Sequence, residues 1–178
     1  MTSANEHEPY IERRICVVKE RARAVSHLMP FTAIPSKMLT DMVFFVVKLL
    51  NLFPVKGGVS TEYSPKTIMS GQTINYKQYS LPFGTYCQVH EEDGQCNSLT
   101  ARTQGAISVS LSSNWQGSQL FFSLNPGRII TRRAWTVIPM PQPVITRVNE
   151  LAADQPSLLT FTDRQLREGS DSSMGQGA

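Results

Sequence analysis

The sequence has 178 residues and a formal net charge of +3, with 40% apolar and 17% charged residues. This is enough apolar material for the core of about one ordinary domain, and it excludes collagen-like, low-complexity and wholly disordered classes. An odd number of cysteines, three, does not make a disulfide framework and indicates a reduced compartment. The first residues contain no apolar signal region, so we expect an intracellular protein that is not secreted.

Two helices are expected in the first third of the chain. From Pro9 onward, apolar residues recur at steps of three and four, which is typical of an amphipathic helix. These residues are Ile11, Ile15, Val18, Ala22 and Val25. A second helix is expected from about Ser36 to Asn51, and its mostly apolar surface predicts a buried central element. Its longest apolar run, Met42 to Val47, is far shorter than the roughly 20 residues of a membrane span, so no membrane association is expected.

Strands are expected after a connector at 55–81, because the apolar period changes there from 3.6 to 2. Alternating residues predict half-buried strands at 107–111 and 120–124, a longer strand at 129–138 and a weaker candidate at 85–90. Short strands separated by turn residues are typical of a small antiparallel barrel and not of a doubly wound parallel sheet.

The chain is therefore expected to have an α+β fold in three parts. Residues 1–70 form a helical segment that begins with a loose polar stretch, and residues 78–140 form a small antiparallel β-barrel. Residues 141–178 form a proline-punctuated, flexible tail with one short helix at 144–151 and disorder from about 167 onward.

Few residues could carry catalysis. Cys87 and His90 have the spacing of two zinc ligands, but a structural zinc site takes four, and in a strand these two point to opposite faces. One buried cysteine and one exposed histidine are therefore expected. The acidic run at 91–93 is typical of a solvated turn. Glu12, within a basic helix face, either forms a surface salt bridge worth at most about 1 kcal/mol or is a metal-binding carboxylate.

Basic residues are unevenly distributed along the sequence. Residues 94–149 contain five arginines and no acid, which predicts a positively charged barrel. The candidate phosphate-binding residues are Arg13, Arg14 and Lys19 on the first helix, and Arg128, Arg132 and Arg133 near Trp135. Arg132 and Arg133 are adjacent in the predicted strand, so they should point to opposite faces. A solvated strand face accounts for these arginines equally well.

The order of these features resembles the integrase portion of a copia-type LTR-retrotransposon polyprotein. The segment Tyr10–Ile15, Tyr-Ile-Glu-Arg-Arg-Ile, resembles the helix that carries the third acid of that family's D-D-E triad. The segments Tyr63–Thr67 and Leu81–His90 resemble, in the same order, the stretch after the last core helix and the following strand. Residues 102–111, 120–124 and 128–135 resemble the remaining strands of an SH3-like small barrel. The resemblance covers about residues 9–140.

The resemblance implies the last helices of an RNase H-like core followed by an SH3-like barrel. It implies that Glu12 is a catalytic acid and metal ligand only in a complete integrase, where three acids hold two Mg²⁺ or Mn²⁺ ions. The other two acids of the triad have no counterpart in this sequence, so this chain alone is expected to be inactive and to need no cofactor. What remains is weak, non-specific binding of DNA or RNA, linked to DNA integration. Expected protein partners are a second copy or the remainder of the polyprotein.

Two other classes of function stay open. The helix at 36–51 is mostly apolar and lacks the sheet against which it would pack in a complete core. If the barrel or a second copy covers this helix, the chain is an interaction or self-association module. It is a free-standing enzyme if Glu12 or Cys87 carries catalysis.

Overall fold

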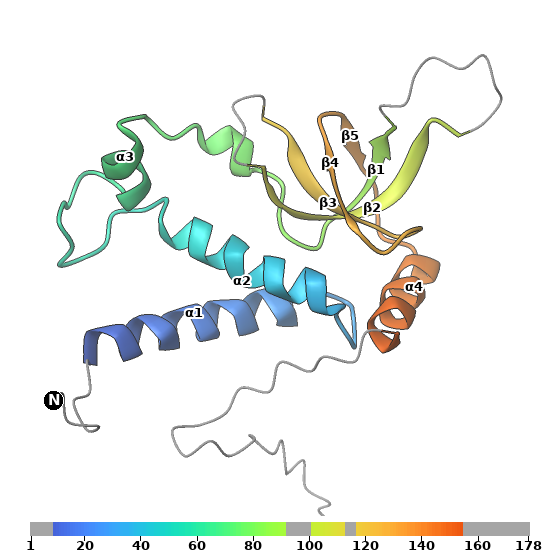
Figure 1. Ribbon diagram of the computed structural model, residues 1–178, viewed down its shortest axis with the longest axis horizontal. Coiled ribbons are helices and arrows are strands. Elements are labelled where there is room, and N and C mark those ends of the chain that lie inside the picture. Colours follow the sequence, from blue (N-terminus) through green and yellow to red (C-terminus); the bar gives the residue numbers. More distant parts are fainter. Residues whose placement is uncertain (1–8, 92–100, 113–116, 155–178) are drawn as a thin grey trace, which may run out of the picture.

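A computed structural model describes residues 9–91, 101–112 and 117–154 (Figure 1). The chain has an α+β fold in which helices precede a five-stranded antiparallel sheet. The helices are α1 (Pro9–His27), α2 (Ser36–Leu50), α3 (Pro65–Ser70), the 3-10 helix η1 (Tyr76–Tyr79) and α4 (Gln142–Ala153). The strands are β1 (Tyr86–His90), β2 (Thr103–Leu111), β3 (Gln119–Ser123), β4 (Ile129–Arg132) and β5 (Trp135–Val137). The loose N-terminal stretch and the disorder expected from about 167 lie outside the described residues.

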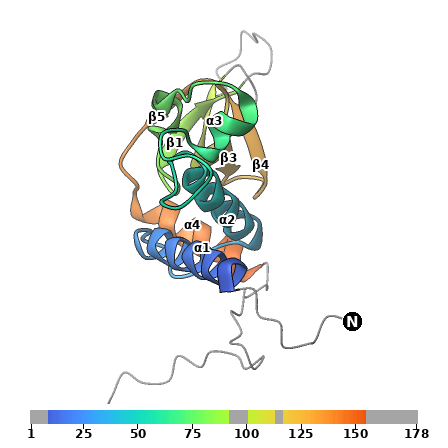
Figure 2. The same cartoon turned by 90° about the vertical axis from the view of Figure 1, so that its left-hand side faces the viewer.

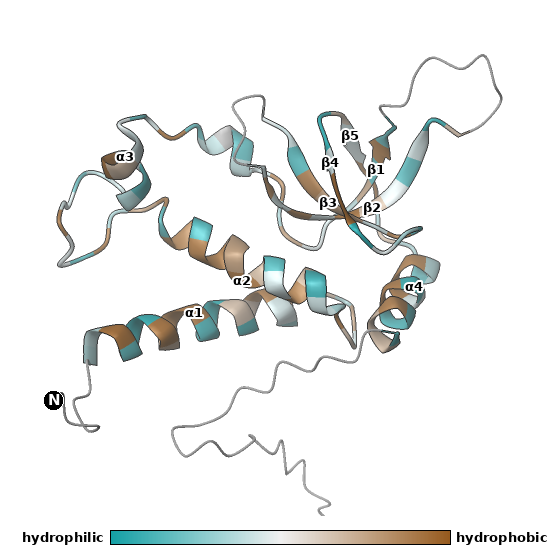
Figure 3. Cartoon of the chain, in the orientation of Figure 1, coloured by the Kyte–Doolittle hydropathy of each residue, from teal (hydrophilic) through white to brown (hydrophobic). Residues whose placement is uncertain are grey.

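The helical layers follow from the spacing of apolar residues. Met38, Met42 and Val46, each four positions apart, are buried on one face of α2. The sheet covers this face, and α1 lies on the other side of α2 (Figures 1 and 2). Apolar segments run along both helices (Figure 3). Within the described ranges, none of the helices has the length and hydropathy of a bilayer span.

The apolar face predicted for α1 is only half covered. Its C-terminal part packs against the core through Val18, Ala22 and Val25, whereas Ile11 and Ile15 are 53% and 49% exposed. The reason is geometric, because α1 and α2 diverge toward the N-terminal end of α1 (Figure 1). An amphipathic period therefore located the helix correctly but overestimated how much of it is buried.

The predicted strand at 129–138 is two strands on opposite edges of the sheet. The strand order is β4-β3-β2-β1-β5, and only Arg133 and Ala134 separate β4 from β5. In a flat sheet the two edges would be about 19 Å apart, but such a link spans only about 11 Å. The sheet must therefore curl until its edges approach. His90 N–H donates to the carbonyl of Ala134 (3.1 Å), which fixes the link beside β1.

Both faces of the curled sheet are buried. One face packs against the helices through Ile107, Val109 and Phe122. The other face encloses a second cluster that contains Leu81, Cys87, Val89, Ala106 and Phe121, with Trp135 packed against it. The expectation that β2 is half-buried was wrong, since Ala106 to Ser110 are all buried. The curl is the physical reason, because it covers the face that a flat sheet would leave in water.

Helix α4 belongs to the core and not to a flexible tail. The helix predicted at 144–151 is present, but it buries Val144, Val148 and Leu151 in the same cluster as α1, α2 and the sheet. The side-chain oxygen of Asn149 accepts the backbone N–H groups of Thr32 (3.1 Å) and Ala33 (3.2 Å). The three parts expected from the sequence therefore share one core in the described residues.

Candidate nucleic-acid interface

The first group of predicted site residues lies along α1. Glu12 and Lys19 are half-buried, and Arg13 is exposed. The guanidinium of Arg14 donates to the hydroxyl of Tyr10 one turn earlier (2.9 Å) and lies over the Tyr10 ring, 5.2 Å from its centroid. The ring therefore holds Arg14 in place at the start of the helix, where both side chains can contact a ligand.

The second group lies at the two ends of β4, and only part of it is available to a ligand. Arg128, just before the strand, and Arg133, just after it, are exposed. Arg132 is half-buried, donates to the Thr131 carbonyl (2.9 Å), and has an Nε atom that is buried without a hydrogen-bond partner among the described residues. Arg132 and Arg133 were expected in one strand, but β4 ends at Arg132 and Arg133 lies in the bend after it, so strand alternation does not decide how these two side chains point.

The structure does not bring the two groups together. Helix α1 packs on the side of α2 that faces away from the sheet, and β4 belongs to the sheet itself (Figures 1 and 2). The part of the chain that holds β2 to β5 nevertheless carries one kind of charge, since residues 101–149 include five arginines and no acid. Of these arginines, Arg147 forms a surface ion pair with Glu150 (3.3 Å).

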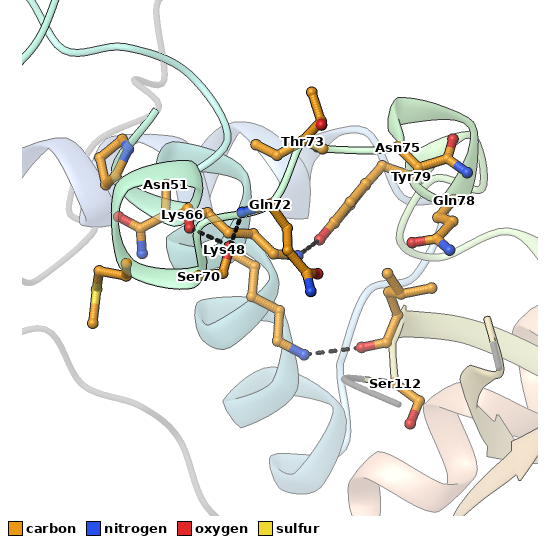
Figure 4. A pocket seen from close by; sticks show the side chains of 14 residues that line it. Lys48, Asn51, Lys66, Ser70, Gln72, Thr73, Asn75, Gln78, Tyr79 and Ser112 are labelled. Carbon is orange, nitrogen blue, oxygen red and sulfur yellow. Dashed lines mark hydrogen bonds between the residues drawn. The ribbon is translucent and has the colours of Figure 1, made fainter. Parts of the chain in front are cut away.

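Sequence reasoning missed a third basic group, Lys48 and Lys66, which share a cavity of about 630 Å³ (Figure 4). The cavity lies between α2, α3, η1 and the end of β2. Its described lining is otherwise rich in amide and hydroxyl side chains and contains no acid. The signal for this site was Lys48 itself, because a lysine that directly follows the apolar run Met42–Val47 needs polar partners for its ammonium group.

Hydrogen bonds fix both ammonium groups. Lys48 Nζ donates to Ser110 Oγ and to the Leu111 carbonyl, each at 3.0 Å. Lys66 Nζ donates to the Tyr79 hydroxyl, and Figure 4 shows this bond and the bond from Lys48 to Leu111. Burial lowers the pKa of Lys48; the positive charge of Lys66 acts in the same direction, and Asp41 opposes it. The two lysines therefore repel each other across the cavity.

The possible cysteine and metal chemistry is limited in the described residues. Cys87 is buried and His90 is exposed, as expected for a strand. Burial raises the pKa of the Cys87 thiol to about 11, so it stays protonated near neutral pH and is a poor nucleophile. Among residues 9–91, 101–112 and 117–154, no three histidine, cysteine or acidic side chains are grouped to hold a metal ion.

The chain was compared with protein-family models, with curated proteins and with solved structures, and none of the three comparisons found a match.

Proposed function

We propose that this chain corresponds to the end of an RNase H-like integrase core followed by an SH3-like barrel, as in copia-type retrotransposons. In this proposal it binds nucleic-acid phosphates, weakly and without sequence preference, as a part of DNA integration, and it has no catalysis of its own. The order of the elements supports the proposal, because helices are followed by a small antiparallel sheet that curls on itself.

The observation that carries the binding function is the charge of the sheet. Arg128 and Arg133 are exposed beside a short edge strand, in a stretch from residue 101 to residue 149 that contains five arginines and no acid. Arginine guanidinium groups bind phosphate oxygens through charge-assisted hydrogen bonds. A surface of this kind favours contact with a phosphate backbone and reads no base sequence.

Glu12 has a passive role in this proposal. It is the candidate third acid by resemblance, and it lies half-buried in the first turn of α1. Two-metal phosphoryl transfer needs carboxylates that clamp both ions, which a single glutamate does not provide. Glu12→Gln should therefore leave nucleic-acid binding unchanged, with or without Mg²⁺. Mg²⁺-dependent strand transfer that this substitution abolishes would contradict the proposal.

The salt dependence of duplex binding tests the proposal. Each protein–phosphate contact contributes about 0.9 to the slope of log affinity against log salt. The double substitution Arg128→Ala and Arg133→Ala should reduce the slope by up to about 1.8. Arg21→Ala, which removes an exposed arginine from α1, is the matched control. An affinity that does not change with salt would rule out phosphate binding, and a slope unchanged by the double substitution would rule out these two arginines.

Self-association is a second candidate function, and the half-covered helices favour it. Ile11 and Ile15 of α1 and Phe44 of α2 are 53%, 49% and 59% exposed. Ile11 and Ile15 are four positions apart and so share one face of α1, and a contiguous exposed apolar patch marks a surface that a partner chain can cover. Sedimentation at micromolar concentration should then show a dimer that Ile15→Glu disrupts. A monomer at all accessible concentrations would exclude this candidate.

A further inference from the structure

The cavity beside α3 combines two positive charges that come from two consecutive helices. Lys48 lies near the end of α2, and Lys66 lies in the first turn of α3. The start of α3 is capped by the Ser64 hydroxyl, which accepts the backbone N–H of Thr67 (3.1 Å). Asp41, a half-buried acid that interacts electrostatically with Lys48, does not line the cavity. An anion between the two ammonium groups would replace their mutual repulsion by two attractions.

Both lysines are held in place before any ligand arrives. An ammonium group has three donors, and the bonds to Ser110 and Leu111 use two of those of Lys48. The pairing of β2 with β3 shifts register between Ser108 and Ser110, next to this contact. Tyr79 of η1 accepts from Lys66 on the other side. Because β2 and η1 fix these side chains, binding an anion would cost little additional ordering.

The rest of the cavity has the size and chemistry of a small-molecule site. A cavity of about 630 Å³ can hold a ligand the size of a nucleotide. The wall carries the amide side chains of Asn51, Gln72, Asn75 and Gln78. Amides both donate and accept hydrogen bonds, which suits base edges and sugar hydroxyls. Met69 and Ile74 add apolar surface on which a flat ring can lie.

We propose that this cavity binds one nucleotide unit, with its phosphate between Lys48 and Lys66 and its base or sugar against the amide side chains. The nucleotide is either free or part of a single strand, since both present the same phosphate ester. The described lining includes no residue of α1 or β4. This site is therefore independent of the arginines that carry the proposed function.

Calorimetric titration of the full chain tests this site with three probes: inorganic phosphate, adenosine monophosphate and an eight-nucleotide single-stranded DNA. Lys66→Gln should weaken binding by about 10- to 100-fold, the range for a lost charge-assisted hydrogen bond. Lys66→Arg, which keeps the charge, should retain most of the affinity. Lys37→Gln, an exposed lysine on α2 that does not line the cavity, should have no effect. Thermal unfolding of each variant without ligand shows whether the fold is intact.

The three probes separate the two sources of the nucleotide. Lysine-dependent binding of adenosine monophosphate, with competition from phosphate, would identify a site for free nucleotides. Lysine-dependent binding of the oligonucleotide alone would identify a site for one unit of a strand. The proposal is wrong if no probe binds, or if Lys66→Gln binds every probe as tightly as the unmodified chain. Loss of binding only in the Arg128→Ala, Arg133→Ala double variant would overturn this site and leave the proposed function standing.

Discussion

Met42→Ala tests whether the helices and the sheet unfold as one unit. Met42 is 2% exposed at the centre of the cluster that joins α1, α2, α4 and the sheet. Replacing a buried methionine by alanine costs about 2–5 kcal/mol, because transfer energy is lost and a cavity remains. Urea slopes of about 1–3 kcal/mol per molar are usual for small domains, and at a slope of about 2 the midpoint should fall by roughly 1–2.5 M. Met69→Ala, at an 89% exposed position, should change stability by less than about 0.5 kcal/mol.

Two probes then follow the same urea titration of Met42→Ala. Far-ultraviolet circular dichroism reports the helices, and tryptophan fluorescence reports the sheet through Trp135 of β5 in a Trp115→Phe background. If the core is shared, both curves should shift together and keep a common midpoint. The reasoning would be refuted if the circular dichroism curve shifted while the fluorescence curve kept its original midpoint. Residues 1–70 and 78–140 would then be independent domains.

The remaining predictions concern one glycine and one cysteine. Gly84 has φ +83°, and a Cβ there would lie 2.9 Å from Cγ and Sδ of Met29. Backbone strain and this steric clash together should lower the free energy of unfolding of Gly84→Ala, measured in urea, by about 2–4 kcal/mol. Gly71→Ala, at φ +67° with nothing within 4 Å, should cost only the backbone strain of about 1–2 kcal/mol. Equal losses of stability in Gly84→Ala and Gly71→Ala would contradict the predicted clash with Met29. Burial raises the pKa of Cys87 from 9.0 to about 11, so the folded chain keeps a proton that the unfolded chain loses above about pH 9. The free energy of unfolding should therefore fall by up to about 2.7 kcal/mol between pH 9 and 11. The stability of Cys87→Ala should not show this decrease between pH 9 and 11. If its unfolding free energy had the same pH dependence as that of the unmodified chain, the effect of Cys87 burial would be excluded.

The sequence predicted local elements well because their signals are local. A period of 3.6 located α1, α2 and α4, and alternation located β1, β2 and β3. Alternation could not show that the chain changes edges after Arg132, because only two residues separate β4 from β5 and no glycine or proline marks the bend. Local signals have the same limit for α4. Its helical period was visible in the sequence, but its packing against the core was not.

The candidate site was harder to predict than the fold. Exposed basic residues such as Arg128 are visible in a sequence as a local excess of charge. The approach of Lys48 to Lys66 depends on how the segment between α2 and α3 loops back to the end of α2, where the Lys66 N–H donates to the Asn51 carbonyl (3.1 Å). No short motif encodes that path. A lysine next to a long apolar run indicates that a polar partner exists, but it does not identify that partner.

The position of β5 also sets an order of folding events. β5 completes the sheet by pairing with β1, which precedes it by about 45 residues, whereas β2, β3 and β4 each pair with the strand just before them. Pairings between distant residues pay a larger loop-closure entropy and form more slowly than local ones. The meander from β1 to β4 can therefore assemble first, and the sheet closes only when Trp135 reaches Val89. During synthesis, β5 can pair with β1 only after residue 137 has left the ribosome. By then, most of the described chain is already outside the ribosome.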